Sequence, residues 1–328
     1  MQRAAGLVEL PALLGDVPLA EVLAGAGVTP ADLRPDAFIP YAAFLDILER
    51  AARLTGREDL GLRLGLRQTL AVLGPVGALM RLAPTLGTAW SDFAAFQIAN
   101  STGSAVYLHR TREDFVVAYG IYAGPVSPQM HDAVIGVACM LMRELTGGRV
   151  GPTEIMTMRP RPRDPGPWTR LADCPVRFGE SQTGLVLPSG AFGFPLPGAD
   201  RRAHAAAFAA LSAKLASTPS GRARQVAHAL RPLMLEGRSG MAEVAGELGT
   251  TPRTLRRALE REGTRFEAIR DEVRFAAARE LLTLTALPVG EIAMTLGFST
   301  HGAFTEAFRR WSGTSPVAWR AERRKHSP

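Results

Sequence analysis

The sequence has few cysteines and no long apolar run, and these absences exclude several classes of protein. Its two cysteines, Cys139 and Cys174, cannot build a disulfide framework or a four-thiolate metal site. The longest apolar stretch, residues 133–142, has ten residues, whereas a membrane-spanning helix needs about 20. The first 16 residues contain a proline and two acidic side chains, so they lack the apolar core of a secretory signal. We therefore expect a cytoplasmic protein that does not enter a membrane.

Common catalytic motifs are missing as well. There is no Gly-x-Ser-x-Gly nucleophile turn, no phosphate-binding loop ending in Gly-Lys-Ser/Thr and no His-Glu-x-x-His zinc motif. His109 and His131 have no carboxylates at metal-ligand spacing, so we expect neither a metal nor another cofactor. The sequence thus predicts a protein that is not an enzyme.

Positive charge is concentrated in the last third of the chain. Residues 221–328 contain 18 Lys plus Arg against 12 Asp plus Glu, whereas residues 1–220 contain 20 against 19. A basic excess confined to one region favours a polyanionic partner for that region. The alternative is a solvated basic surface. The arginine-rich stretch at residues 159–166 is expected to be a solvated loop.

A small, polar, turn-forming segment, ASTPSG at residues 216–221, follows a helical pattern at residues 200–215. We therefore divide the chain into an amino-terminal domain (1–215), a linker (216–221) and a carboxy-terminal domain (222–328).

The amino-terminal domain changes its hydrophobic period part-way along. Apolar residues recur at helical spacing in the first hundred residues and then alternate, as in strands. A nearly all-apolar helix, opened by Ser127 and Pro128, follows the first two strands. Helices are expected at residues 17–27, 41–54, 74–83 and 85–101, and strands at 105–113, 114–123, 154–160, 176–180 and 184–189. This order predicts an α+β domain, helices first and a mostly antiparallel sheet second.

The carboxy-terminal domain contains an internal repeat. EVAGELG at residues 243–249 recurs 48 residues later as EIAMTLG at 291–297, with four identical positions. In each copy a short helix ends at a glycine, and a second helix begins at a hydroxyl residue, Thr251 in one and Ser299 or Thr300 in the other. The pattern is typical of a helix-turn-helix, present twice in an all-α domain. Residues 266–282 are expected to form one helix that separates the two units.

Helical geometry identifies the outward side chains of each second helix. If Leu255 and Leu259 are buried in the first unit, and Phe304 and Phe308 in the second, the opposite faces are free to contact DNA. These faces carry Arg253, Thr254, Arg256 and Arg257 in the first unit, and His301, Gly302, Ala303, Glu306 and Arg309 in the second. Guanidinium groups can donate two hydrogen bonds to guanine. We therefore expect more direct base readout from the first unit. Ordinary helical hairpins with arginine-rich surfaces are the alternative.

Residues 223–320 resemble the DNA-binding domain of AraC/XylS-type transcriptional regulators. The resemblance rests on Ile292, Ala293, Gly297, Phe298, Phe304 and Phe308, followed by Gly313, Ser315, Pro316, Trp319 and Arg320. It assigns base reading to Arg253, Arg256, Arg257, His301, Gly302 and Glu306, although Gly302 departs from the polar residue usual there. Residues 54–65, 74–87, 174–187 and 194–200 are similar to the non-cupin effector domain loosely labelled arabinose-binding.

The resemblance implies a bacterial transcription factor that binds double-stranded DNA, contacts RNA polymerase and forms a homodimer. It also implies a small-molecule effector in the amino-terminal domain, for which we expect a pocket between helices and sheet. The candidate lining residues are Trp90, Phe93, Tyr107, Tyr119 and Tyr122, with plain core packing as the alternative. Two other hypotheses stay open: a ligand-independent regulator whose first domain only dimerises, and a redox sensor that uses Cys139 and Cys174.

Overall fold

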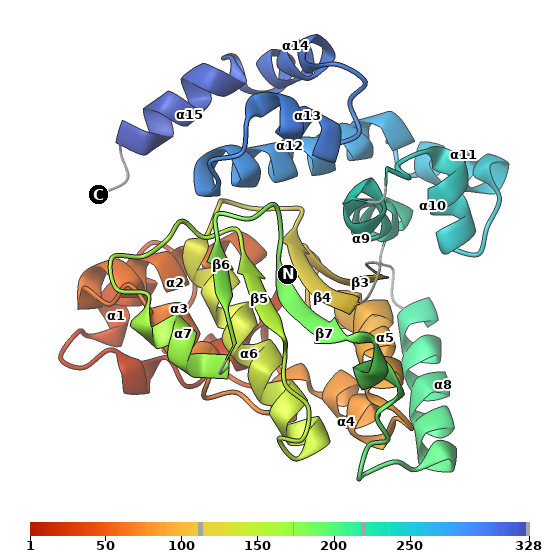
Figure 1. The fold of residues 1–328 in the computed structure, drawn as a ribbon. Coiled ribbons are helices and arrows are strands. Elements are labelled where there is room, and N and C mark those ends of the chain that lie inside the picture. The colour runs from red at the N-terminus through yellow and green to blue at the C-terminus, as the bar shows by residue number, and fades with distance from the viewer. Residues whose placement is uncertain (111–113, 173, 218–220, 236, 326–328) are drawn as a thin grey trace.

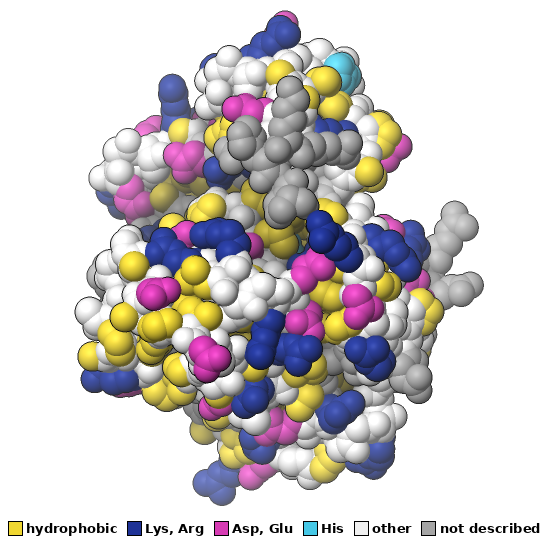
Figure 2. Space-filling view, turned by 90° about the vertical axis from the view of Figure 1, so that its left-hand side faces the viewer, with side chains coloured by type: hydrophobic (Ala, Val, Ile, Leu, Met, Phe, Trp, Pro, Cys, Tyr) yellow, Lys and Arg dark blue, Asp and Glu magenta, His cyan; other side chains and the backbone are white. Residues whose placement is uncertain are grey.

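The chain folds into a larger amino-terminal lobe and a smaller carboxy-terminal lobe (Figure 1). The structure is a computed structural model that describes residues 1–110, 114–172, 174–217, 221–235 and 237–325. The larger lobe combines a sheet with the helices up to α8, and the smaller lobe consists of α9 to α15. Figure 2 shows lysines and arginines scattered over the visible face of both lobes. None of the described helices combines the length and the apolar character that crossing a membrane requires.

The elements of the larger lobe follow the expected order of helices first and sheet second. Its helices are α1 (Leu19–Leu23), α2 (Tyr41–Thr55), α3 (Leu60–Gly65), α4 (Pro75–Leu82), α5 (Leu86–Phe96), α6 (Pro128–Thr146), α7 (Gly166–Ala172) and α8 (Arg201–Ser217). Its strands are β1 (Gln2–Arg3), β2 (Phe38–Ile39), β3 (Ser104–Arg110), β4 (Asp114–Ile121), β5 (Glu154–Thr157), β6 (Val176–Phe178) and β7 (Thr183–Pro188). The predicted α+β class is confirmed.

The main sheet has the strand order β3-β4-β7-β5-β6. All neighbouring pairs are antiparallel except β5 and β6, which are parallel. The alternation predicted for β4 is present: Val117, Tyr119 and Ile121 join the main core, while Val116 and Ala118 pack on the other face. The pairing of β1 with β2 was not predicted, because two residues per strand carry no detectable period.

Helix α6 is fixed by direct backbone contact with α3. The hydroxyl of Ser127 caps it by accepting a hydrogen bond from the amide of Met130 at 3.1 Å. A Cβ atom added to Gly61 would lie 2.1 Å from the carbonyl oxygen of Gln129, and one added to Gly65 would lie 2.2 Å from that of Ala133. Only glycine permits this approach, so the two helices pack closer than ordinary side chains would allow.

A buried polar cluster joins α6 to the segment after β5. Asp132, fully buried, accepts hydrogen bonds from Nη1 of Arg159 at 2.6 Å and from Nε1 of Trp168 at 2.9 Å. Arg159 also contacts Glu58 at 2.9 Å and is only 4% exposed. The expectation of a solvated loop at residues 159–166 is therefore wrong for its first arginine, whose ion pairs replace the lost hydration.

The smaller lobe contains only helices. They are α9 (Arg222–Leu235), α10 (Met241–Glu247), α11 (Pro252–Arg261), α12 (Phe266–Leu284), α13 (Val289–Thr295), α14 (His301–Ser312) and α15 (Pro316–Lys325). Helix α12 is continuous, as predicted. Helix α8 extends through Ser217, into the expected linker, and α9 begins at Arg222. Of that linker, residues 218–220 lie outside the described part of the chain.

The contact between α3 and α6 predicts the effect of a single methyl group. Gly61→Ala should lower the free energy of unfolding by about 1–3 kcal/mol or more, because the added Cβ overlaps the Gln129 carbonyl and forces the helices apart. Gly151→Ala is the matched control, since nothing lies within 4 Å of a Cβ there, and it should change stability by less than about 0.5 kcal/mol. Urea denaturation followed by circular dichroism measures both. Equal stability of the two variants would contradict the contact.

Candidate DNA-binding surface and ligand cavity

The first helix-turn-helix consists of α10 and α11. Gly249 ends the turn with φ at +60°, a conformation that favours glycine. The hydroxyl of Thr251 then caps α11 by accepting from the amide of Thr254 at 3.2 Å. Leu255 and Leu259 are buried, which fixes the rotation of α11 about its own axis.

The second unit, α13 and α14, repeats this construction. Gly297 has φ at +72°, and Thr300, not Ser299, caps α14 by accepting from the amide of Ala303 at 3.1 Å. Helix α12 holds the turn in place, because Nη2 of Arg274 donates to the carbonyl oxygen of Gly297 at 3.1 Å. The same guanidinium lies 4.6 Å from the ring centre of Phe298, a cation–π contact.

All nine side-chain positions expected to face DNA are exposed. They are Arg253, Thr254, Arg256 and Arg257 on α11, and His301, Gly302, Ala303, Glu306 and Arg309 on α14. Within the described chain, Arg253, Arg256 and Arg257 have no carboxylate partner, whereas Arg310 is held by Asp271 at 2.9 Å. In Figure 1, α14 lies at the top of the smaller lobe and α11 at its right-hand end. The α11 guanidinium groups are thus available to an external anion.

Gly302 has no steric reason to be glycine. The nearest atom to an added Cβ would be the Thr300 hydroxyl oxygen, 3.9 Å away. The absence of a side chain there therefore reduces the contact surface of α14 without serving the fold.

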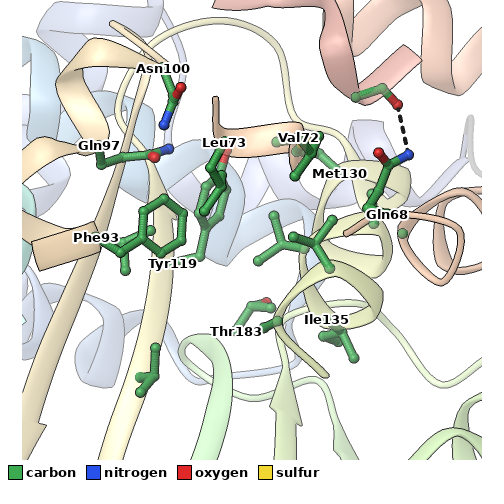
Figure 3. Close-up of a pocket in the computed structure, with 18 of the residues that line it drawn as sticks. Gln68, Val72, Leu73, Phe93, Gln97, Asn100, Tyr119, Met130, Ile135 and Thr183 are labelled. Atoms are coloured by element: carbon green, nitrogen blue, oxygen red, sulfur yellow. Dashed lines mark hydrogen bonds between the residues drawn. The ribbon is translucent and has the colours of Figure 1, made fainter. Parts of the chain in front are cut away.

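The larger lobe encloses a cavity of about 110 Å³ between the sheet and α2, α3, α5 and α6 (Figure 3). Of the five aromatic residues considered for an effector site, Trp90, Phe93 and Tyr119 line it. Tyr107 instead packs on the other face of the sheet. Tyr122 packs edge-on against His228 of α9, with ring centres 6.1 Å apart. The cavity therefore brings three of the five together.

Polar residues of the cavity wall were not found from the sequence. Gln2, Arg3, Gln68, Gln97, Asn100 and Thr183 all line it. Gln97 and Asn100 fall in a stretch that reads as the end of a helix, and Gln2 and Arg3 lie close to the start of the chain. No motif or period connects these segments, so only the fold shows that they meet.

The two lobes dock through α9 and α12, which pack against β3 and β4. At the centre, Nε2 of His131 on α6 lies 3.0 Å from Oε1 of Glu280 on α12, with both side chains buried. At the edge, Nη2 of Arg279 donates to the carbonyl oxygen of Gly124 at 3.0 Å. Leaving a buried charged side chain such as Glu280 without a partner costs free energy. The pair therefore favours the docked arrangement in which both side chains meet.

The docking pair adjoins the cavity wall. The hydroxyl of Tyr119, a cavity residue, lies 2.8 Å from that of Tyr41. Burial raises the pKa of both phenols, and the nearby Glu280 carboxylate raises them further, so both stay neutral at physiological pH. His131 follows Met130, another cavity residue, on α6. Two cavity residues, Tyr119 and Met130, are therefore neighbours of side chains near the interface.

The described part of the chain shows no metal site, and the environment of Cys139 bears on thiol chemistry. Within the described ranges, no three His, Cys, Asp or Glu side chains are grouped as metal ligands. Burial raises the pKa of the Cys139 thiol to about 12, which disfavours the reactive thiolate.

Comparison with known proteins matches both lobes to families. Residues 17–196 match the arabinose-binding domain of AraC transcription regulators, and residues 244–322 match a helix-turn-helix domain. The HTH-type transcriptional regulator VirS of Mycobacterium tuberculosis is 28% identical over 291 residues, covering 87% of this chain and 85% of VirS. The ornithine utilization regulator of Pseudomonas aeruginosa is 42% identical over 80 residues, 24% of either chain. The crystal structure of the transcriptional regulator CdpR from Pseudomonas aeruginosa covers 93% of this chain and 96% of CdpR, with 25% identity and a TM-score of 0.46.

The sequence relatives are transcriptional regulators and not enzymes, in agreement with the missing catalytic motifs. The first family match alone spans 180 of the 328 residues, from 17 to 196. Together with the capped tandem helix-turn-helix, it identifies the chain as a member of the AraC family of transcriptional regulators, with an amino-terminal domain of the arabinose-binding type.

Proposed function

We propose that this protein is a cytoplasmic, sequence-specific regulator whose affinity for DNA is controlled by a small molecule in the amino-terminal cavity. Residues 1–215 bind the effector and form a homodimer, residues 216–221 link the domains, and residues 222–328 bind double-stranded DNA and contact RNA polymerase. The single observation that carries the proposal is that the cavity wall adjoins the side chains that hold the DNA-binding lobe.

Base readout is assigned mainly to α11. Its outward face carries three exposed arginines without carboxylate partners, whereas that of α14 carries Gly302 and Glu306. Paired hydrogen bonds from arginine to guanine are the commonest specific contact in the major groove. Helix α14 adds contacts through His301, Glu306 and Arg309, and the methyl group of Ala303 can touch thymine.

Control by the effector works through the docked lobes. A ligand shifts a conformational equilibrium only if it binds one conformation better than another. A ligand against Tyr119 and Met130 displaces residues that neighbour Tyr41 and His131, and His131 pairs with Glu280 of α12. Since α12 connects the two helix-turn-helix units, moving it changes how both reach the DNA.

The cavity favours this reading over a first domain that only dimerises, because a purely structural domain gains nothing from an open space in its core. The redox alternative has less support, since the buried Cys139 thiol resists ionisation.

Arg253→Ala should weaken binding to the preferred DNA sequence by about 1–3 kcal/mol, with the loss confined to one or two base positions. Arg202→Ala, on the exposed start of α8, removes the same charge and should leave binding unchanged. Selection from a randomised DNA library at about 0.15 M salt measures affinity and base preference together. A loss spread evenly over all sequences would make Arg253 a phosphate contact and contradict base readout.

Glu280→Ala should change the affinity for DNA at least about threefold, although Glu280 lies on neither α11 nor α14. Its removal leaves His131 without its partner and weakens the docking by about 1–3 kcal/mol. Glu272→Ala is the matched control, since Glu272 is an exposed glutamate on the same helix. Binding isotherms of the three proteins on one DNA duplex give the comparison. Equal affinities of the Glu280 variant and the wild type would argue against coupling through this interface.

A further inference from the structure

The chemistry of the cavity wall indicates which class of molecule it takes. Most of the lining is apolar and comes from several elements, including Leu48 of α2, Leu73, Val106 of β3, Met130 of α6 and Leu185 of β7. Such a wall suits a hydrocarbon or aromatic group. It does not suit a sugar, whose many hydroxyl groups would outnumber the polar partners and lose their hydration.

Two polar side chains of the cavity, Gln97 and Asn100, lie together at one end. Gln97 and Asn100, only 5% and 4% exposed, lie together above Phe93 and Tyr119, with Gln68 across the space (Figure 3). Oε1 of Gln97 and Nδ2 of Asn100 are both buried without a hydrogen-bond partner. Buried polar atoms are nearly always paired in folded proteins, so unpaired ones that line a cavity indicate a polar group of a ligand.

Arg3 gives this end a positive charge. It is the one charged side chain among the described residues that line the cavity. Its Nε atom is also buried without a partner. The amide of Arg3 donates to the carbonyl oxygen of Asn100 at 2.9 Å, which ties the backbone of Arg3 to the polar end, while its guanidinium lies against Gly74.

Arg3 is half-buried and lies toward the surface of the lobe. Its guanidinium carbon lies 5.8 Å from the ring centre of Phe38, which is 43% exposed. A charged ligand group bound here is the last part of the ligand to lose contact with bulk water. The positive charge of the Arg3 guanidinium then stabilises it. A guanidinium group binds a carboxylate with two parallel hydrogen bonds, a stronger contact than a neutral amide offers.

We propose that the cavity binds a small monocarboxylic acid in its ionised form, with the carboxylate against Arg3 and Asn100 and the apolar body against the helices and sheet. The cavity of about 110 Å³ is smaller than an apolar cavity of roughly 150 Å³ that holds benzene, so the enclosed apolar body has at most about six carbon atoms. This inference rests on the proposed function, since it names the effector class of the same site.

Calorimetric titration of the full-length protein at pH 7 tests the ligand class. The probes are hexanoate and benzoate, their neutral amides, and L-arabinose. Both acids should bind, and each amide should bind at least about tenfold more weakly, because it lacks the charge that Arg3 recognises. Equal binding of acid and amide, binding of arabinose alone, or no binding of either acid would overturn the assignment to monocarboxylates.

Two variants locate the binding site. Arg3→Gln should weaken binding of the acids at least about tenfold and leave the amides unchanged. Ala138→Phe fills the cavity from α6 and should abolish binding of both classes. Arg34→Gln, an exposed arginine of the same lobe, is the control. Circular dichroism and thermal unfolding verify that each variant is folded. Acid binding that survives both substitutions would place the ligand elsewhere and overturn the proposal.

A DNA-binding titration with and without hexanoate separates this inference from the proposed function. If the acid binds through Arg3 and DNA affinity changes, the result supports both the ligand class and the control of DNA binding by the cavity ligand. If it binds through Arg3 and DNA affinity stays the same, the ligand class stands and control by this effector falls.

Discussion

The fold depends on the constraint that α6 is enclosed by other elements along most of its length. Its backbone touches α3 through glycines, its apolar side chains line the cavity, and Asp132 ties it to Arg159 and Trp168. His131, on the next position, meets α12 of the other lobe. Because a close-packed interior transmits displacement instead of absorbing it, no neighbour of α6 can move independently of the others. The cavity and the interface between the two lobes are therefore coupled through α6.

The carboxy-terminal domain was largely predictable from the sequence, because its information is local. A repeat at a fixed offset, a glycine at each turn and a hydroxyl cap after it specify the two units, and the caps are present in the structure. The buried leucines and phenylalanines then fix which residues face outward. The roles of these outward residues at DNA remain predictions, since exposure alone does not establish a base contact.

The amino-terminal domain was predictable only in part. Periodicity located the main strands and the long helices, but strand order depends on contacts between distant segments. The polar end of the cavity combines residues 2–3 with residues 97–100, which no spacing rule connects. Glu280 lies in the pattern of an ordinary amphipathic helix, where a glutamate reads as solvated. Its burial follows from docking against another lobe, which the sequence of α12 does not encode by itself.

The two helix-turn-helix units are built alike but present unlike faces, arginines on α11 and a glycine and a glutamate on α14. A single continuous helix of about 28 Å joins them, so their order along the duplex is set by the chain. A site read by two different helices in a fixed order is not a palindrome. Under the proposed readout, each bound protomer has a direction along the DNA, and reversing the site would turn the amino-terminal lobe to the opposite side of the promoter.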